Sequence, residues 1–289
     1  MKLVTLADSR VGRLEDGSVA LLDAPSMRAY FEGGQAARPT GEELPPEQAG
    51  LAAPIVPKKF FHTAGNFREH EEESKRVDWS HRIAPWIVFF QNVDAIIGPE
   101  EAIVYPEHLT EELDYELELA VVIAKPGRWF GPEEAGEYIG GYVIFNDITA
   151  RDIQRREMES GVFSFCKAID TFCPLGPWIV TPDEVGDPHD LAMTLRVNGE
   201  TRQTSHSGRM SVTIAEILAH YSALGYSAGD VVSTGTVSGV AGFSEDPAAL
   251  YLKPGDVIEA EIERLGVLRN PVVSWQEAHG EPPPPRVRW

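Results

Sequence analysis

The sequence predicts a mainly β protein with some α-helix, in which a small N-terminal domain precedes a larger one. Two observations support this fold class. After residue 55 most apolar segments are short, rich in Val, Ile and Phe, and bounded by turns that contain Gly or Pro, which is typical of largely antiparallel strands. Before it, the Pro- and Gly-rich segment 37–50 has the composition of a linker. We therefore expect a small domain and linker in residues 1–55 and the main domain in residues 56–289.

The expected strands follow one another along the chain. In the first domain MKLVTL and SVALLD flank the turn-forming EDGS. In the second domain the strand segments are KKFFHTAG, WIVFF, LELAVVIA, YVIFND, AMTLRVNG, VVSTG and VIEAEIE. Helices are expected at about 149–159 and at 213–224. The second is the clearer one, because its apolar residues recur at helical spacing, Thr213 and Glu216 are spaced as a capping box, and Gly225 ends it.

Composition excludes some classes of partner. The formal net charge is −20, so the basic surface that nucleic acids and anionic membranes require is missing, and we expect neither as a partner. No apolar run reaches the roughly 18 residues of a membrane span, and the first residues lack the apolar core of a signal peptide. We expect a soluble, cytoplasmic protein. Cys166 and Cys173 are the only cysteines, and we interpret both as reduced, packed residues.

Three acidic residues carry the main chemical hypothesis. Glu116 and Glu118 alternate with apolar residues, so in a strand they point to the same face, roughly 6 to 7 Å apart. Asp147 ends the next buried strand. Converging carboxylates resist ionisation unless a cation lies between them, and an oxygen-only set suits Mg²⁺, Mn²⁺ or Ca²⁺ rather than Zn²⁺. The alternative is that the glutamates lie on a solvated strand face and Asp147 caps the following helix.

A second hypothesis concerns the charged segment NFREHEEE, in which His70 and Glu73 are three residues apart. One helical turn would bring them onto the same face, where a Glu that accepts from one imidazole nitrogen leaves the other free to take a proton from water. Such a pair is a general base. Flexible charged segments of this kind can also serve as lids, here about residues 66–80. The alternative is a solvated, highly charged helix.

Two further segments contain residues suited to anion binding. In FCKAIDTFCPLGP, Lys167 lies in apolar, turn-rich surroundings and must find an anion, either Asp170 or a substrate. In DVVSTGTVSGVAG a strand runs into a loop of small and hydroxyl residues, which can bring Thr236 and the backbone around Gly235 close to a carboxylate. The same composition also describes many ordinary bends.

Taken together, these segments resemble the fumarylacetoacetate hydrolase family over roughly residues 62–266. The matching stretches are, in order, GNFREHEEE, IIGPEEAIVYP, LDYELELAVVI, GYVIFNDITARDIQ, KAIDTFCPLGPWIV, LRVNGETRQ, GDVVSTGTVSGV and LKPGDVIEAEIERLG. The resemblance implies a mixed β-roll catalytic domain that depends on a metal, a small N-terminal domain before it, and a homodimer.

The resemblance also implies a role for each matching residue. Glu116, Glu118 and Asp147 fall where the family's ligands for a divalent metal fall, usually Mg²⁺ and sometimes Mn²⁺ or Ca²⁺. His70 and Glu73 match the water-activating dyad. Lys167 matches a lysine that polarises the substrate or its oxyanion, and Thr236 a threonine that contacts the substrate's carboxylate.

Two departures from the family pattern concern the substrate. Gln91 stands in FFQN, where the family often has a lysine in FFKP, so we include Gln91 with Thr236 and Gly235 among the expected substrate contacts. Val237 stands where proline is usual. Both changes leave the metal ligands intact and alter the expected pocket instead.

The reaction that we expect is metal-dependent hydrolysis of a carbon–carbon bond in a β-diketo acid of the acylpyruvate type, which gives a 2-oxo acid such as pyruvate and a carboxylic acid. The alternative is a lyase or isomerase acting by the same enolate chemistry: oxaloacetate decarboxylation, or keto-enol or double-bond isomerisation of a 2-oxo dicarboxylate. Neither needs activated water. A third reading is a non-catalytic metal-binding protein.

Overall fold

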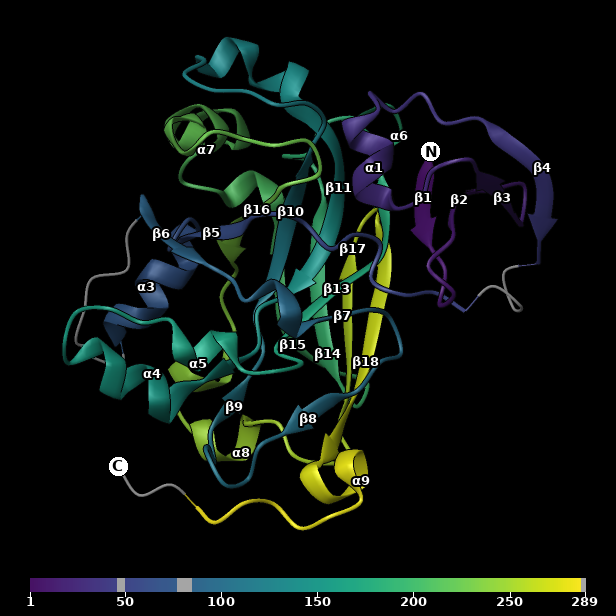
Figure 1. The fold of residues 1–289 in the computed structure, drawn as a ribbon. Helices are drawn as coiled ribbons and strands as arrows, with labels where there is room; N and C mark the ends of the chain where they lie inside the picture. Colours follow the sequence, from purple (N-terminus) through teal and green to yellow (C-terminus); the bar gives the residue numbers. More distant parts are fainter. Residues whose placement is uncertain (46–49, 77–84, 287–289) are drawn as a thin grey trace.

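A computed structural model describes residues 1–45, 50–76 and 85–286 of the chain. The expected linker and the expected lid therefore lie partly outside the described residues, at 46–49 and 77–80. In its described part the linker prediction is wrong, because Pro39–Leu44 form a strand that pairs with Ser18–Leu22. Strands dominate the described part, and short helices lie around them (Figure 1). The fold class predicted from the sequence is confirmed.

The largest element is a mixed eleven-stranded sheet. Ten of its strands form a continuous path and β7 (Ile96–Ile97) pairs with β13 beside it. In spatial order the path is β4 (Pro39–Leu44), β3 (Ser18–Leu22), β2 (Val11–Glu15), β1 (Lys2–Thr5), β13 (Cys173–Val180), β11 (Ile139–Asn146), β10 (Leu117–Ile123), β16 (Val231–Thr236), β5 (Phe60–Ala64) and β6 (Ile87–Phe90).

A second sheet has five strands and packs beside the first; β13 and β11 of the large sheet contact its β17 and β18. Its order is β15 (Glu200–His206), β14 (Ala192–Val197), β17 (Val257–Ile262), β18 (Gly266–Ser274) and β8 (Ile103–Tyr105). A short pair, β12 (Thr149–Ala150) with β9 (Leu113–Asp114), completes the strands of the described residues.

The helices are short. They are α1 (Met27–Glu32), α3 (Arg68–Arg76), α4 (Arg151–Met158), α5 (Phe165–Ala168), α6 (Pro182–Val185), α7 (Ile214–Tyr221), α8 (Pro247–Leu250) and α9 (Trp275–His279). The 3₁₀ turns are η1 (Val93–Ala95), η2 (Pro132–Tyr138), η3 (Ser207–Arg209), η4 (Ser222–Leu224) and η5 (Ala241–Phe243).

The clearest predicted helix is confirmed, with its ends. The Thr213 side chain accepts from the backbone N–H of Glu216, and the Glu216 carboxylate accepts from the backbone N–H of Thr213, which is the expected capping box. Helix α7 continues into η4, and Gly225 follows with φ 71°. The other predicted helix begins two residues later than expected, because Thr149 and Ala150 pair with β9 instead.

Of the strands that escape the sequence patterns, the three longest are β13, β15 and β18. The segment CPLGPWIV contains two prolines, yet forms β13, which pairs with β11 and β1. Strands β15 and β18 also lacked a clear signal, since β15 is polar throughout and β18 contains Pro271. Pairing with strands that are distant in the sequence places these segments in the sheets. Local sequence patterns do not predict that pairing.

The N-terminal strands extend the same sheet that carries the main domain. They lie at one edge of the molecule in Figure 1, and β1 pairs with β13 through Lys2 and Val180. One buried cluster contains Leu3 and Phe31 of the N-terminal part together with Phe60 and Val143 of the main sheet. The two parts therefore share a core across β1 and β13.

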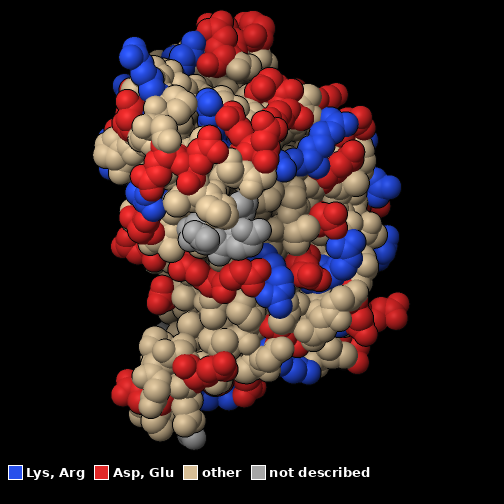
Figure 2. Space-filling view, turned by 90° about the vertical axis from the view of Figure 1, so that its right-hand side faces the viewer, with Lys and Arg blue, Asp and Glu red and all other residues tan. Residues whose placement is uncertain are grey.

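The surface reflects the acidic composition. On the face shown in Figure 2, acidic side chains are spread widely, and basic side chains lie between them rather than in one continuous patch. Within the described ranges, none of the helices is long and apolar enough to cross a membrane.

Candidate active site

The three predicted acids meet where β10 and β11 pair. Antiparallel register sets Leu117 opposite Asn146, and Asp147 donates its backbone N–H to the Glu116 carbonyl oxygen at 2.8 Å. Glu116 and Glu118 therefore face the same side beside Asp147. All three are buried, with exposures of 5%, 2% and 0%. The alternative of a solvated strand face is wrong.

Two cations are buried among these acids. Lys167 Nζ lies 2.9 Å from Glu116 Oε2 and 2.6 Å from Asp147 Oδ2. Arg151 Nη2 lies 2.7 Å from Glu116 Oε1, while its Nε donates to Asp114. Lys167 thus points into the acid cluster instead of pairing with Asp170. The buried negative charge is partly neutralised by the chain itself, as burial requires.

The crowded charges shift the pKa values of two carboxyl groups in opposite directions. Burial raises the pKa of Asp147 to about 6, because desolvation and the neighbouring carboxylates outweigh the attraction of Lys167. Burial alone would also raise the pKa of Glu116, but Lys167 and Arg151 outweigh it and lower that pKa to about 2. Ionising Asp147 is therefore more costly than ionising Glu116.

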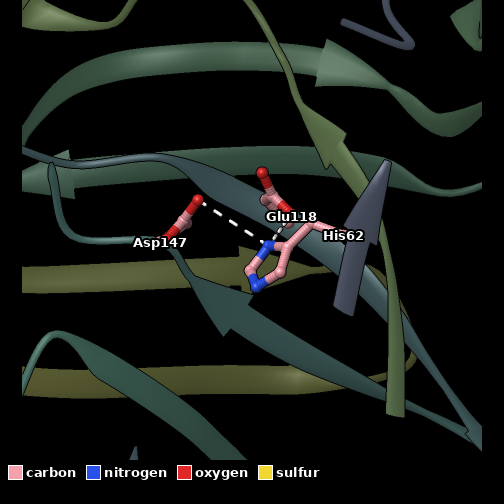
Figure 3. A group of neighbouring side chains, drawn as sticks. All are labelled: His62, Glu118 and Asp147. Carbon is pink, nitrogen blue, oxygen red and sulfur yellow. Dashed lines mark ion pairs between the residues drawn. The ribbon is translucent and has the colours of Figure 1, made fainter. Parts of the chain in front are cut away.

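A histidine that the sequence patterns did not single out completes the cluster. His62 lies on β5, fully buried, with Nδ1 3.6 Å from Glu118 Oε2 and 3.7 Å from Asp147 Oδ2 (Figure 3). The segment KKFFHTAG was recognised as a strand, and His62 is its one ionisable residue beyond the lysines. An ionisable side chain in an otherwise apolar strand was the signal that could have found it.

The donor atoms fit a divalent cation. Within the described residues, ligand atoms of His62, Glu118 and Asp147 lie within 4.8 Å of one another. Both ring nitrogens of His62 and Oδ1 of Asp147 are buried and have no hydrogen-bond partner in the described part of the chain. Buried polar atoms normally have a hydrogen-bond partner. These atoms lack one, and a bound cation would supply a partner to those that face it. Glu116 lies next to them, but its oxygens are engaged by Lys167 and Arg151.

The predicted dyad forms on helix α3. His70 Nδ1 lies 3.3 Å from Glu73 Oε2, and the backbone N–H of Gly239 donates to Glu73 Oε1 at 3.0 Å. The His70 ring stacks on Phe243 with 5.2 Å between ring centroids. Glu73 is held by the loop after β16, and it in turn orients the imidazole. This is the geometry that the i, i+3 spacing predicts.

His70 of the dyad and the three acids line the same cavity, which has an empty volume of about 570 Å³, part of it open to solvent. Its polar lining includes His70, Lys167, Thr236 and the three acids, and its remaining wall is largely apolar: Ala64, Ile87, Phe89, Met158, Phe163 and Phe243. Residues more than 100 positions apart in the sequence thus line one cavity.

The expected substrate contacts are only partly brought to this cavity. Thr236 lines it, with its hydroxyl donating to the Leu117 carbonyl oxygen at 3.2 Å and accepting from Gln203. Gly235 is not in the lining; its φ of 90° and the Thr63 carbonyl oxygen, 2.8 Å from where a Cβ would stand, explain why glycine is needed there. Gln91 is buried outside the lining and accepts from the Asn92 N–H.

Relatives with this mainly β fold include proteins named as hydrolases, isomerases and tautomerases. A model of the fumarylacetoacetate (FAA) hydrolase C-terminal domain matches residues 59–273. The chain belongs to the fumarylacetoacetate hydrolase family.

Three relatives illustrate the range of this family. The chain is 40% identical over 196 residues to a 2,4-didehydro-3-deoxy-L-rhamnonate hydrolase of Sphingomonas sp. (strain SKA58), covering 68% of this chain and 67% of the relative. It is 36% identical over 233 residues to the human protein named oxaloacetate tautomerase FAHD2A, mitochondrial, covering 80% and 71%. Among solved structures, maleylpyruvate hydrolase from Sphingobium sp. SYK-6, in complex with manganese(II) ion and pyruvate, is 26% identical with a TM-score of 0.76, covering 95% and 99%.

Proposed function

We propose that the protein is a divalent-metal-dependent hydrolase that cleaves a carbon–carbon bond in a β-diketo acid of the acylpyruvate type. The products would be a 2-oxo acid such as pyruvate and a carboxylic acid. One observation carries the proposal: His70, which Glu73 contacts, lines the same cavity as the acids of the candidate metal site. A reaction that only moves protons on a 2-oxo acid has no need of activated water, whereas hydrolysis does.

The proposed metal donors are Glu116, Glu118 and Asp147, with Mg²⁺ as the expected ion and Mn²⁺ or Ca²⁺ as alternatives. A cation bound there supplies Lewis-acid polarisation to the 2-oxo acid group of the substrate. Manganese(II) and pyruvate together in the maleylpyruvate hydrolase complex support a metal of this kind beside a 2-oxo acid.

The remaining steps fall to the chain's own residues. His70, whose Nδ1 faces Glu73, takes a proton from water at Nε2 as the water oxygen attacks the distal carbonyl. Lys167 donates to the resulting oxyanion, and Thr236 contacts the substrate's carboxylate. The carbon–carbon bond then breaks, its electron pair passes to the pyruvate fragment as an enolate, and protonation of that carbon by the imidazolium of His70 restores the dyad.

The cavity wall supports an apolar acyl group at the far end of the substrate. Of the lining residues in the described ranges, Lys167 and Arg151 are cationic, and both already contact carboxylates. Phe89, Phe163 and Met158 make much of the remaining surface apolar. A second substrate carboxylate, as in oxaloacetate, would be desolvated there without a free cation to meet it, which is costly.

The second candidate is a tautomerase, isomerase or decarboxylase acting on a 2-oxo dicarboxylate such as oxaloacetate. The human relative's name, oxaloacetate tautomerase, supports it. The same residues would hold the metal, which would again supply Lewis-acid polarisation, and His70 would then shuttle a proton rather than activate water.

One experiment separates these readings. Ultraviolet loss of a panel of acylpyruvates with growing alkyl or aryl groups, and of oxaloacetate, is followed with and without Mg²⁺ in the wild type and in His70→Ala. We expect metal-dependent consumption of acylpyruvates, about 100- to 10,000-fold slower in His70→Ala, with pyruvate and a carboxylic acid as products. Turnover of oxaloacetate and of no acylpyruvate would instead establish the second candidate, and hydrolysis unaffected in His70→Ala would refute the role of the dyad.

A further inference from the structure

The buried side chain of His62 is packed tightly against aromatic rings. Its ring is stacked between Phe60, at 4.9 Å between centroids, and Phe89, at 4.3 Å, and the edge of Phe145 contacts it at 4.9 Å. The three aromatic rings leave the imidazole little rotational freedom. Burying an imidazole in such surroundings without a hydrogen bond costs free energy, so this placement needs a reason.

The ring directs one nitrogen at two carboxylates without bonding to either. Nδ1 lies 3.6 Å from Glu118 Oε2 and 3.7 Å from Asp147 Oδ2 (Figure 3). A charge-assisted hydrogen bond would bring such atoms to about 2.7 to 2.9 Å. The described residues provide no hydrogen-bond partner for Nδ1 or Nε2. A simple ion pair between a protonated His62 and these acids therefore does not account for the geometry.

The same distances suit donor atoms that share a cation. Two donors each about 2.1 Å from an ion, at a roughly tetrahedral angle, are separated by about 3.4 Å. The other members of the group are positioned for this as well: the Ser233 hydroxyl donates to Glu118 Oε2 and fixes that carboxylate, while Asp147 Oδ1 has no hydrogen-bond partner among the described residues.

We propose that His62 is a nitrogen ligand of the metal centre, so that the site is a mixed nitrogen and oxygen site selective for ions such as Mn²⁺ and Co²⁺ over Mg²⁺ and Ca²⁺. Imidazole favours the transition ions, whose affinities rise from Mn²⁺ to Co²⁺ and beyond, whereas Mg²⁺ and Ca²⁺ favour oxygen. The inference rests on the divalent-metal dependence in the proposed function. It replaces the oxygen-only ligand set expected from the sequence with one that includes His62.

Direct ligation can be read from the bound ion without measuring turnover. Purified wild type is freed of metal, loaded with Mn²⁺, and examined by pulsed electron paramagnetic resonance, before and after labelling of histidine with ¹⁵N. We expect a hyperfine coupling to ¹⁴N in the unlabelled protein, and a coupling to ¹⁵N in its place after labelling. The matched variants are His62→Asn, which puts an amide oxygen near the position of Nδ1, and His70→Asn, which alters the histidine of the dyad. The coupling should disappear in His62→Asn and persist in His70→Asn.

Competition titrations of Co²⁺ against Mg²⁺ give the second measurement. Loss of a metal-ligating side chain should reduce Co²⁺ affinity by about 10- to 100-fold or more while Mg²⁺ affinity changes little, so the preference for Co²⁺ should fall at least tenfold in His62→Asn. Wild type that binds Mn²⁺ without a histidine coupling would overturn the inference and leave the proposed hydrolase intact. So would a coupling lost only in His70→Asn, or an unchanged Co²⁺ preference.

Failure of the metal itself gives a different result. Wild type that binds none of these ions would overturn both this inference and the metal-dependent function. Because the wild-type spectrum and the His70→Asn control do not depend on His62→Asn folding, the inference stays open to refutation even where that variant is unstable.

Discussion

The two halves of the candidate active site are built differently. Asp147 and the two glutamates lie at paired ends of central strands and are almost entirely buried. Lys167 contacts Glu116 and Asp147, and Arg151 contacts Glu116. The dyad lies on α3, a nine-residue helix that the described residues hold mainly by hydrogen bonds to its acidic side chains. One half belongs to the core of the sheet, and the other is attached to its rim.

This difference suggests a division of labour. Strand pairing fixes the acids to the accuracy that metal ligation needs, since a ligand displaced by a fraction of an ångström loses most of its bond. A helix on the rim can be replaced or shifted without disturbing the core, which would let related proteins keep the metal and change the reaction. The relatives' names, which include hydrolase and tautomerase, agree with such variation.

The largest effect should follow removal of one carboxylate charge from the acids at the strand ends. Asp147→Asn keeps the shape of the side chain and should abolish Mn²⁺ binding and lower kcat/KM by about 1,000-fold or more, because a metal ligand is lost. Folding without metal should change little, because Lys167 keeps its pair with Glu116 while the crowding among buried carboxylates is relieved. Calorimetric titration measures Mn²⁺ binding, and urea unfolding measures the stability of the metal-free protein. A variant that still binds Mn²⁺ tightly would remove Asp147 from the site.

A comparable effect, on stability, should follow loss of the buried lysine. Lys167→Met leaves Asp147 and Glu116 without the cation at 2.6 and 2.9 Å, and breaking a buried ion pair costs about 3 to 5 kcal/mol of unfolding free energy. Excess Mn²⁺ should recover much of it, since the ion restores positive charge. The control is Lys125→Met, which removes an exposed pair with Glu137 and should change the stability far less. Equal costs in the two variants would contradict the prediction.

The helix half should give a smaller and more selective effect. Glu73→Gln removes the charge that orients His70 and should lower kcat by about 10- to 100-fold, because the imidazole becomes a poorer base. Mn²⁺ affinity should stay within about threefold of wild type, since Glu73 lies outside the ligand cluster. Matching losses of metal binding and activity would show that the two halves are not separate.

Sequence patterns found these halves unequally for a physical reason. Glu116, Glu118, His70 and Glu73 are pairs at local spacing, so the periods of strand and helix already place them together. His62 reaches the acids only because β5 lies beside β16, which in turn pairs with β10. That neighbourhood depends on strand order, and strand order is set by packing across the whole sheet.

The same reason explains the strands that were missed. Pro174 and Pro177 argue against a central strand when the segment is read locally. In the fold, β13 is nevertheless held between β11 and β1. The family resemblance supplied what local patterns could not, namely the role expected of Lys167, although its contact with Glu116 and Asp147 had to be seen in the structure.

A pH dependence distinguishes the halves further. The raised pKa of Asp147 means that its contribution to stability is present below its ordinary value near 3.8 and is lost as pH rises through about 6. Glu116, with a pKa near 2, contributes above its ordinary value of 4.5 and loses that contribution as pH falls through about 2. At neutral pH Asp147 is ionised at a cost in free energy, and a bound cation reduces that cost. Below about pH 6 the cation must first displace the proton of the Asp147 carboxyl group.

We accordingly expect the increase in Tm caused by Mn²⁺ to be larger near pH 7.5 than near pH 5, with affinity falling up to about tenfold per pH unit below 6. Glu73→Gln should show the same profile as wild type, because the dyad holds no part of the ion. Stabilisation by Mn²⁺ that does not depend on pH in this range would show that Asp147 is ionised throughout.

The smallest effect concerns how α3 is held. Glu69 accepts from the Ser205 hydroxyl on β15 and lies 2.6 Å from Arg209 Nη1, so it ties the dyad's helix to the second sheet. Arg209 is 63% exposed, and a pair of this kind contributes under about 1 kcal/mol, or less than about fivefold in a rate. Glu69→Gln should therefore lower kcat/KM by about two- to fivefold and leave Mn²⁺ binding unchanged.

Helix α3 itself offers the control. Glu71 pairs at 3.0 Å with Lys75 of the same helix, so Glu71→Gln removes a similar charge without touching the second sheet and should leave kcat/KM within error of wild type. If both variants behave alike, the tether to β15 does not position His70, and the hydrogen bond from Gly239 to Glu73 must hold the dyad alone. If Glu69→Gln is instead as damaging as Glu73→Gln, the rim of the site is as demanding as its core, and the contrast between the two halves fails.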